Sequence, residues 1–307
     1  MSISRELLKI TLLPLGTCAG NTTVYQKHSA HLLEIQDNHK RVAILLDAGN
    51  KRVKSNRLYD IDDLELILIS HDHLDHCLYI GALVQKLNFR GRRRKLKIIS
   101  HVQAIKRIRV LIKIWNLGRI PRFVEFMSVD LPPRMDATFD VPPINLGNGG
   151  LDEIQIEIAT IMARHTPSTI AYRLKIKHAA IQENALLDLV FSPDTSFKSD
   201  HLVQFAQHAG FWLLDTTFAT WEIQKQIKEY TEGKRGARFP GHSSPEYSAR
   251  LCERAGVQNY VMVHYFWSRF ARHFKDVKGN LSILGKKCFS RNIIIATELE
   301  PIILFHE

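Results

Sequence analysis

The sequence predicts an α/β protein in which two β-sheets pack face to face and helices cover their outer faces. Short apolar segments of strand length alternate with longer amphipathic segments in both halves of the 307 residues. A sheet or an amphipathic helix has to bury its apolar face against another layer, which favours this layered arrangement. No linker, internal repeat or change in composition divides the chain, so we expect one domain spanning residues 1–307.

The first half begins with short apolar segments and continues with a strand that ends at a histidine cluster. That strand is Leu64–Ser70, and the segment after the cluster, Cys77–Leu87, predicts a helix. Residues 130–150 are rich in proline and glycine and predict loops. Further strands are expected at Ile10–Leu15, His31–Ile35, Val42–Asp47 and Leu96–Ser100, and a basic amphipathic helix at Ala104–Trp115.

The second half follows the same style. Helices are expected at Leu202–His208, Trp221–Tyr230 and Pro245–Ala255, and Gly256 is a natural C-cap for the last of them. Strands are expected at Ile154–Ile161, Ile170–Ile176, Leu186–Phe191, Trp212–Leu214 and Tyr260–His264, with one or two more in Ile293–Leu304.

The net charge of +11, with an isoelectric point near 9.5, favours anionic partners, nucleic acid first among them. The segment Lys86–Arg122 carries thirteen Lys or Arg and no acidic residue, and it is densest at Arg90–Lys95. Two interpretations stay open for this basic segment. It attracts phosphate groups, or it is a solvated loop followed by the polar face of a helix.

The four cysteines are far apart and form no CxxC pair, which suits a reducing cytoplasm. No apolar run approaches the length that crosses a bilayer, so we expect no membrane association. The N-terminus lacks the apolar core and cleavage site of a signal peptide.

The segment from His71 to His76 places three imidazoles and a carboxylate directly after a buried strand. In an extended turn, residues two apart point the same way, so His71 and His73 can hold one ion. Asp75 and His76 then turn toward a neighbouring position. Nitrogen and carboxylate oxygen ligands suit zinc, and also manganese or iron. The alternative is a polar loop that happens to be rich in histidine.

Other motifs follow this one in a fixed order along nearly the whole chain. Together they resemble the metallo-β-lactamase superfamily and, within it, ribonuclease Z. The matching segments are Leu15-Gly16-Thr17 with Gly20, Leu46–Gly49, His71–His76, His165 with Tyr172-Arg173, Phe191–Thr195, Gly241–Ser244, Val263-His264 and Ser268–Phe270.

This resemblance implies a four-layer αββα sandwich with two divalent metal ions. Zinc is the expected metal, and manganese and iron are the alternatives. By the resemblance, one ion is held by His71, His73 and His165, the other by Asp75, His76 and His264, and Asp194 bridges them. Two such ions lower the pKa of a shared water and clamp the oxygens of a phosphoryl centre. Taken singly, His165, Asp194 and His264 have ordinary alternatives as loop, capping or core residues.

Three residues outside the ligand set complete the predicted site. His242 is expected to touch substrate phosphate or to protonate the leaving oxygen, and Ser243 beside it to bind substrate. Asp215 stands where ribonuclease Z has a glutamate and is expected to hold His242 in its charged form. Asp75, His242 and Asp215 are thus the candidate catalytic residues. The alternatives are helix capping at 242–245 and turn capping by Asp215.

Two further departures from ribonuclease Z bear on function. Leu74 replaces a small residue inside the metal loop, and we expect it to narrow or dry the floor of the site. Between His165 and Asp194 the family usually carries an exosite arm that grips tRNA, and this chain has too few residues there for one. The missing arm weakens the case for tRNA processing and leaves small cyclic phosphodiesters open.

The leading hypothesis is a metal-dependent phosphodiesterase that hydrolyses RNA or a small cyclic phosphodiester by means of a hydroxide shared between two ions. One alternative is hydrolysis of a lactone or another C–O or C–N bond. Another is a catalytically inactive relative that binds nucleic acid. Relatives of ribonuclease Z are commonly dimers, so a homodimer is possible.

Overall fold

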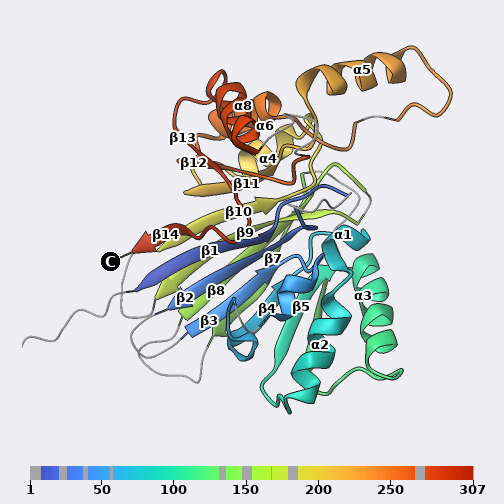
Figure 1. The fold of residues 1–307 in the computed structure, drawn as a ribbon, viewed down its shortest axis with the longest axis vertical. Coiled ribbons are helices and arrows are strands. Elements are labelled where there is room, and N and C mark those ends of the chain that lie inside the picture. Colours follow the sequence, from blue (N-terminus) through green and yellow to red (C-terminus); the bar gives the residue numbers. More distant parts are fainter. Residues whose placement is uncertain are drawn as a thin grey trace, which may run out of the picture.

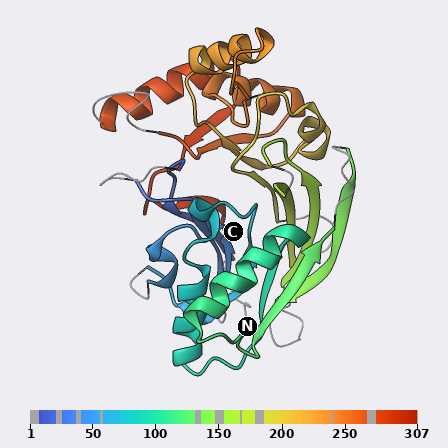
Figure 2. The same ribbon diagram turned by 90° about the vertical axis from the view of Figure 1, so that its right-hand side faces the viewer.

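The computed structural model describes residues 8–20, 26–36, 41–55, 58–130, 136–146, 154–166, 168–178, 186–238, 240–266 and 274–306. Two seven-stranded sheets dominate these residues. Figures 1 and 2 show the sheets packed against each other, with helices on both outer sides. The predicted α/β fold with two facing sheets is confirmed.

The first sheet has the strand order β14-β1-β2-β3-β4-β5-β6. Strands β3 to β6 run parallel, and the β14–β1–β2–β3 part is antiparallel. Its strands are β1 (Lys9–Gly16), β2 (Ala30–Gln36), β3 (Arg41–Leu46), β4 (Leu64–Leu68), β5 (Leu96–His101), β6 (Val124–Val129) and β14 (Ile302–His306).

The second sheet has the order β13-β12-β11-β10-β9-β8-β7. Strands β10 to β13 are parallel, whereas β7 to β10 form an antiparallel meander. Its strands are β7 (Thr138–Leu146), β8 (Ile154–Met162), β9 (Ile170–His178), β10 (Leu187–Ser192), β11 (Phe211–Asp215), β12 (Asn259–Val263) and β13 (Asn292–Ile295).

The helices form two outer layers. The first sheet is accompanied by α1 (Leu74–Cys77), α2 (Ile80–Phe89), α3 (Val102–Trp115) and two 3-10 turns, Lys51–Lys54 and Ile61–Asp63. On the other side lie α4 (Asp200–Phe205), α5 (Thr220–Thr231), α6 (Pro245–Ala255) and α8 (Phe274–Lys286). Gly256 caps α6 in the left-handed conformation, as predicted. Within the described residues, no helix is long and apolar enough to cross a membrane.

Side chains that point alternately to the two faces of each strand build three apolar clusters. On β3, Val42, Ile44 and Leu46 face the cluster between the sheets, while Ala43 and Leu45 face the cluster under α2 and α3. A third cluster fills the space between the second sheet and α4, α6 and α8. Because a strand places successive side chains on opposite faces, strands buried on both sides are apolar throughout. This pattern fixes the register of the central strands.

The carboxyl ends of the parallel strands of both sheets meet at one end of the sandwich. The loops that follow β4, β10, β11 and β12 lie there, together with the loop after β8 (Figure 1). Open α/β sheets place their ligand sites outside the carboxyl ends of the strands. The predicted metal loop, which follows β4, therefore lies at this end.

The prediction of loops across residues 130–150 is wrong for its central part. Strand β7 occupies Thr138–Leu146 and pairs with β8 over most of its length. Pro142 and Pro143 lie where the register shifts between Val141 and Ile144. Prolines cannot donate to a ladder, and an edge strand with a bulge accommodates them. The other prolines and glycines of the stretch, at 132, 133, 147, 149 and 150, lie outside the described residues.

Other boundaries differ less. The helix predicted at Cys77–Leu87 is two helices, α1 and α2, separated at Leu78-Tyr79, and α1 already begins inside the histidine cluster. Strand β6 and helix α8 were not predicted from the sequence. In β6 the residue pattern mixes charged, apolar and polar side chains because this strand forms the edge of its sheet.

We expect that replacing Tyr172 by phenylalanine destabilises the fold by about 1–2 kcal/mol. The Tyr172 hydroxyl of β9 lies 2.8 Å from the carbonyl oxygen of Ile69 and 3.0 Å from that of Ile99, so it joins the two sheets in the buried interior. Urea unfolding measures the change. Tyr79→Phe, at a partly exposed tyrosine, is the control, and equal stability of the two variants would contradict this account.

Candidate metal centre

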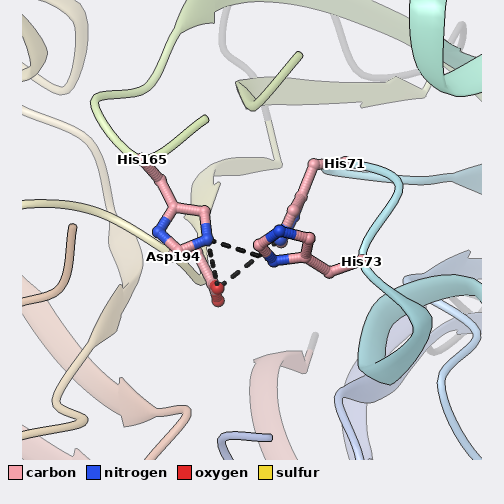
Figure 3. A group of neighbouring side chains, drawn as sticks. All are labelled: His71, His73, His165 and Asp194. Carbon is pink, nitrogen blue, oxygen red and sulfur yellow. Dashed lines mark hydrogen bonds and ion pairs between the residues drawn. The ribbon is translucent and has the colours of Figure 1, made fainter. Parts of the chain in front are cut away.

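Four side chains from three loops converge on one point (Figure 3). His71 and His73 follow β4, His165 follows β8, and Asp194 follows β10. Each offers one ligand atom, and these atoms all lie within 4.8 Å of one another. His165 Nε2 lies 3.2 Å from His73 Nδ1 and 3.3 Å from Asp194 Oδ2. The second sheet thus completes a group that the loop after β4 begins.

A second group lies beside the first. Asp75 and His76 belong to the short helix α1, and His264 follows β12 with a positive φ of 55°. Their ligand atoms also lie within 4.8 Å of one another. His76 Nε2 is 3.2 Å from His264 Nε2 and 3.5 Å from Asp75 Oδ2. A non-glycine residue with positive φ stores strain, which indicates that the surroundings fix the direction of the His264 ring.

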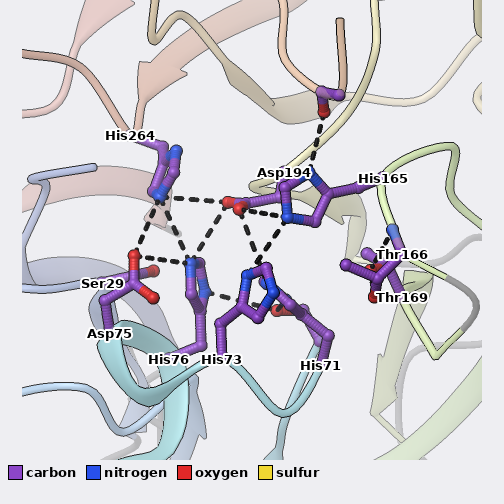
Figure 4. A network of polar contacts seen from close by, with 12 residues as sticks. Ser29, His71, His73, Asp75, His76, His165, Thr166, Thr169, Asp194 and His264 are labelled. Atoms are coloured by element: carbon purple, nitrogen blue, oxygen red, sulfur yellow. Dashed lines mark hydrogen bonds and ion pairs between the residues drawn. The ribbon is translucent and has the colours of Figure 1, made fainter. Parts of the chain in front are cut away.

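The carboxylate of Asp194 lies between the two groups (Figure 4). Its Oδ2 atom is 3.3 Å from His165 Nε2 and 3.5 Å from His71 Nε2. Its Oδ1 atom is 3.2 Å from His76 Nε2 and 3.1 Å from His264 Nε2. One oxygen therefore faces each histidine group, which is the geometry of a bridging ligand.

The donor set fits divalent ions. His71 Nε2 and Asp194 Oδ1 are buried and have no hydrogen-bond partner among the described residues. The pairs His73–His165 and His76–His264 also point ring nitrogens at each other at 3.2 Å. Buried polar atoms that make no hydrogen bond are costly, and imidazole and carboxylate groups that converge in this way are typical metal ligands.

The protonation states of four of the ligand candidates suit cation binding, whereas Asp194 and Asp47 raise the pKa of His76 well above its ordinary value, against the effect of burial. Burial lowers the pKa of His71 well below its ordinary value and lowers the pKa of His165 to about 4, so both rings are neutral near pH 7. Burial alone would raise the pKa of Asp194, but His264 and His76 hold it well below its ordinary range. The pKa of Asp75 is also lowered, against the effect of burial, by His76 and His264. The carboxylates are therefore charged.

Hydrogen bonds at the far side of the rings fix their orientation. His76 Nδ1 donates to Asp47 Oδ2 at 2.6 Å, and His71 Nδ1 lies 3.0 Å from the Ser70 hydroxyl, which itself donates to Asp47. His165 Nδ1 donates to the Gly241 carbonyl at 2.9 Å. Such outer partners set which ring nitrogen is free to bind metal.

His264 is oriented in the same way from the second sheet. Its Nδ1 lies 2.9 Å from Thr217 Oγ1, and that hydroxyl donates to Asp215 Oδ1. Asp47 and Thr217 were not predicted as site residues. The motif Leu46–Gly49 was noticed in the sequence and could have identified Asp47, whereas nothing in the sequence distinguishes Thr217.

Close backbone contacts hold the metal loop against the turn that follows β3. A Cβ atom on Gly49 would overlap the carbonyl oxygen of Asp75, so only glycine permits this approach. The Gly20 N–H donates to Asp75 Oδ2 at 3.0 Å. Ala48 and His76 are also joined by a backbone hydrogen bond of 2.7 Å. These contacts explain why glycine-containing motifs precede the histidine cluster in the sequence.

His242 and Asp215 form the predicted pair. His242 Nδ1 donates to Asp215 Oδ2 at 2.8 Å, and the ring of His242 lies 4.6 Å from that of His165. Asp215 is fully buried and also accepts from the Thr195 N–H. Burial alone would lower the pKa of His242, but the Asp215 carboxylate raises it to about 8. His242 is therefore a proton donor at neutral pH.

A pocket of about 510 Å³ opens over this pair and the first histidine group. Its lining contains His73, His165 and His242, and its far wall comes from α5 and the segment after it. The size lies in the range of small-molecule and cofactor sites. A reacting group in this pocket has the imidazole of His242 within reach.

Two expectations about the site are corrected. Ser243 is fully buried, its hydroxyl accepts from Ser248 Oγ at 2.8 Å, and it does not line the pocket, so substrate cannot reach it. Leu74 is 58% exposed and also lies outside the pocket lining, so it does not dry the floor of the site. The neighbouring Ser244 is the N-cap of α6, which agrees with the capping alternative for that position.

The densest part of the basic stretch, residues 90–95, is mostly engaged with the protein itself. Arg92 donates to the backbone carbonyls of Asp62, Leu64 and Lys95, and Arg90 pairs with Asp62. On α3, Arg107 pairs with Asp72 at 2.9 Å. These contacts favour the interpretation of residues 90–95 as a structural loop over that of a phosphate-binding patch.

The segment between His165 and Asp194 is a β-hairpin. Strands β9 and β10 pair antiparallel, from Tyr172 with Phe191 to Ile176 with Leu187. Residues 179–185, which join them, lie outside the described residues. The strands leave few residues for an additional arm, in line with the sequence prediction.

Comparison with known proteins agrees with this geometry. The family described as "Beta-lactamase superfamily domain" matches residues 43–265. The chain belongs to the β-lactamase superfamily. All the ligand candidates, together with His242 and Asp215, lie within this match.

Several superfamily members resemble the chain at low identity. Ribonuclease Z of Thermoplasma acidophilum is 24% identical over 230 residues, which cover 66% of this chain and 69% of that protein. The metallo-β-lactamase fold protein YhfI from Bacillus subtilis aligns with a TM-score of 0.67 at 18% identity, over 96% and 99% of the two chains. Human tRNase Z, short form, gives 0.62 at 14% identity, over 95% and 98%. The predicted αββα sandwich of this superfamily is thereby confirmed.

We expect Asp47→Asn to lower the affinity for Zn²⁺ about 10- to 100-fold, because the amide does not orient His76 and Ser70 as the carboxylate does. Competition with a fluorescent zinc chelator measures the affinity. Asp200→Asn, at an exposed residue that pairs with Arg254 far from the ligands, is the matched control. Unchanged affinity in folded Asp47→Asn protein would contradict the assignment.

Proposed function

We propose that the protein is a two-metal phosphodiesterase resembling ribonuclease Z. The observation that carries the proposal is the His242–Asp215 pair beside two histidine groups that share the Asp194 carboxylate. Such a pair provides a protonated imidazole where a leaving oxygen develops charge. The curated relatives named ribonuclease Z support the same reaction class.

In this proposal, His71, His73 and His165 hold one divalent ion, while Asp75, His76 and His264 hold the other, and Asp194 contacts both. Zinc suits these nitrogen and oxygen donors, and manganese and iron are the alternatives. When bound, two such ions lower the pKa of water and neutralise charge on a phosphoryl group. Asp75 acts as a ligand of the second ion.

The residues of the chain perform the proton transfer. His242 Nδ1 is engaged by Asp215, which leaves Nε2 to carry the proton toward the pocket. Asp215 accepts hydrogen bonds from the Thr195 and Thr217 N–H groups, which fix its carboxylate and thereby keep His242 in one orientation. His242 then donates its Nε2 proton to the departing alkoxide oxygen.

The proposed substrate is a phosphodiester, with RNA placed before small cyclic phosphodiesters because of the ribonuclease Z relatives. A lactone or an amide is the second candidate, since other members of the superfamily cleave such bonds. The relatives named ribonuclease Z favour the phosphodiester over this second candidate. An inactive binding protein is disfavoured by the complete ligand set.

We also propose that residues 1–307 act as one hydrolase domain, since both sheets contribute ligands to the same centre. All four cysteines are free thiols, three of them buried, which suits the proposed cytoplasmic location. The homodimer stays a prediction, and the sedimentation velocity of the purified chain tests it.

The purified protein is expected to contain about two divalent ions per chain, mainly zinc. Asp194→Asn should bind about one ion or fewer, because the bridging carboxylate balances the repulsion between two cations. Inductively coupled plasma mass spectrometry measures the metal content. Two tightly bound ions in Asp194→Asn would exclude a bridging role.

Asp215→Asn is expected to lower kcat by about 10²-fold or more on a dinucleotide, whose alkoxide leaving group needs a proton. The loss should be much smaller on bis-p-nitrophenyl phosphate, because p-nitrophenolate leaves without protonation. Both assays contain added Zn²⁺ or Mn²⁺, and a lactone and a β-lactam are run beside them.

The exposed Asp200→Asn variant serves as the control for these kinetics. Equal losses on both phosphodiesters would remove the general-acid role of His242. Turnover of the lactone or the β-lactam, without turnover of either phosphodiester, would reject the proposed function.

A further inference from the structure

Helix α5 stands out from the body of the protein. Figure 1 shows α5 and the segment that follows it projecting beyond both sheets and the other helices. Of its twelve residues, only Ile223 is buried. The helix is attached at its start, where Thr220 Oγ1 lies 2.8 Å from Ser244 Oγ. We refer to residues 220–238 as the α5 arm.

The arm forms the outer wall of the pocket. Gln226 and Glu229 from α5, and Arg238 from the returning segment, line the same pocket as His165 and His242. Residues three apart on a helix share a face, so α5 turns one continuous face toward the site. The arm is thus in position to contact whatever lies next to the reacting group.

Some charged side chains of the arm form ion pairs with one another, and others do not. Lys228 pairs with Glu232, and Lys234 pairs with Glu229 and Glu232. In the part of the chain that the structure describes, neither Arg235 nor Arg238 has an acidic partner, and both are exposed. Two guanidinium groups therefore follow one another along the returning segment, and the inner one lies at the pocket.

The backbone presents these two arginines on an open turn. Gly233 and Gly236 adopt positive φ values of 65° and 81°, and the Ala237 N–H donates to the Lys234 carbonyl. A Cβ atom at either glycine would meet nothing within 4 Å, so the turn is unobstructed on its outer side. A chain-like ligand that leaves the pocket can follow this surface.

We propose that the α5 arm binds the polynucleotide strand adjoining the scissile phosphate, with Arg238 on the nearest flanking phosphate and Arg235 further along the strand. This inference rests on the proposed phosphodiesterase function and names a polymer, single-stranded RNA, as its substrate class. A pocket of about 510 Å³ has room for about one nucleotide. A small cyclic phosphodiester would fill the pocket and leave Arg235 unused.

The salt dependence of RNA binding tests whether the α5 arm contacts RNA phosphates. Fluorescence anisotropy of a labelled single-stranded RNA with the metal-loaded protein gives the affinity over a series of salt concentrations. Each arginine that contacts a phosphate contributes about 0.7 to the slope of log affinity against log salt for a single strand. Arg235→Ala and Arg238→Ala should each weaken binding and flatten the slope by about this amount.

Lys228→Ala is the matched control, because it removes one positive charge from the same arm at a residue that pairs with Glu232 and does not line the pocket. It should leave the slope unchanged. Equal slopes for the wild type, Arg235→Ala and Arg238→Ala overturn the proposal, as does equal flattening by Lys228→Ala. Far-ultraviolet circular dichroism verifies that each variant is folded.

The binding readout requires no turnover, so it separates the two proposals. If the wild type does not hydrolyse bis-p-nitrophenyl phosphate but binds RNA through the two arginines, the phosphodiesterase function is rejected and RNA binding by the α5 arm is supported. If it hydrolyses this substrate but the slopes are unaltered, RNA binding by the α5 arm is rejected and the phosphodiesterase function is supported.

Discussion

The interaction on which the rest of the site depends is that of the buried Asp194 carboxylate with imidazoles from two groups. Four ring nitrogens lie between 3.1 and 3.5 Å from its two oxygens. A buried carboxylate without polar or charged partners costs several kcal/mol, so the convergence of the loops that carry these rings stabilises it. Asp194 therefore sets the relative position of the ends of β4, β8, β10 and β12.

The sandwich meets this requirement by ending parallel strands of both sheets at one place. The rings of His71, His76, His165 and His264 are then held from behind by groups that belong to the fold, such as Asp47 for His76 and the Gly241 carbonyl for His165. Asp215 has two functions in this arrangement, because it orients His242 directly and His264 through Thr217. His242 and the second histidine group are therefore coupled through one buried carboxylate.

The residue types of His71–His76 predicted a metal loop by themselves, whereas His165, Asp194 and His264 were predicted only through the resemblance to a family; the structure brings all of them together. The central strands could be predicted as well, since both of their faces are buried and apolar. The prolines of β7 misled the prediction, because an edge strand tolerates residues that a central strand excludes. The burial of Ser243 and the role of Thr217 depend on contacts between distant segments, which leave no local pattern.

The weak attachment of α5, through Ile223 and its first turn, has an evolutionary consequence. Surface segments that bury little accept insertions, deletions and changes of charge at small cost in stability. Selection can therefore lengthen, shorten or recharge this helix while the candidate metal ligands stay fixed at the strand ends. A change of substrate would then require mutations in one short stretch of the gene, without a passage through unfolded or metal-free intermediates.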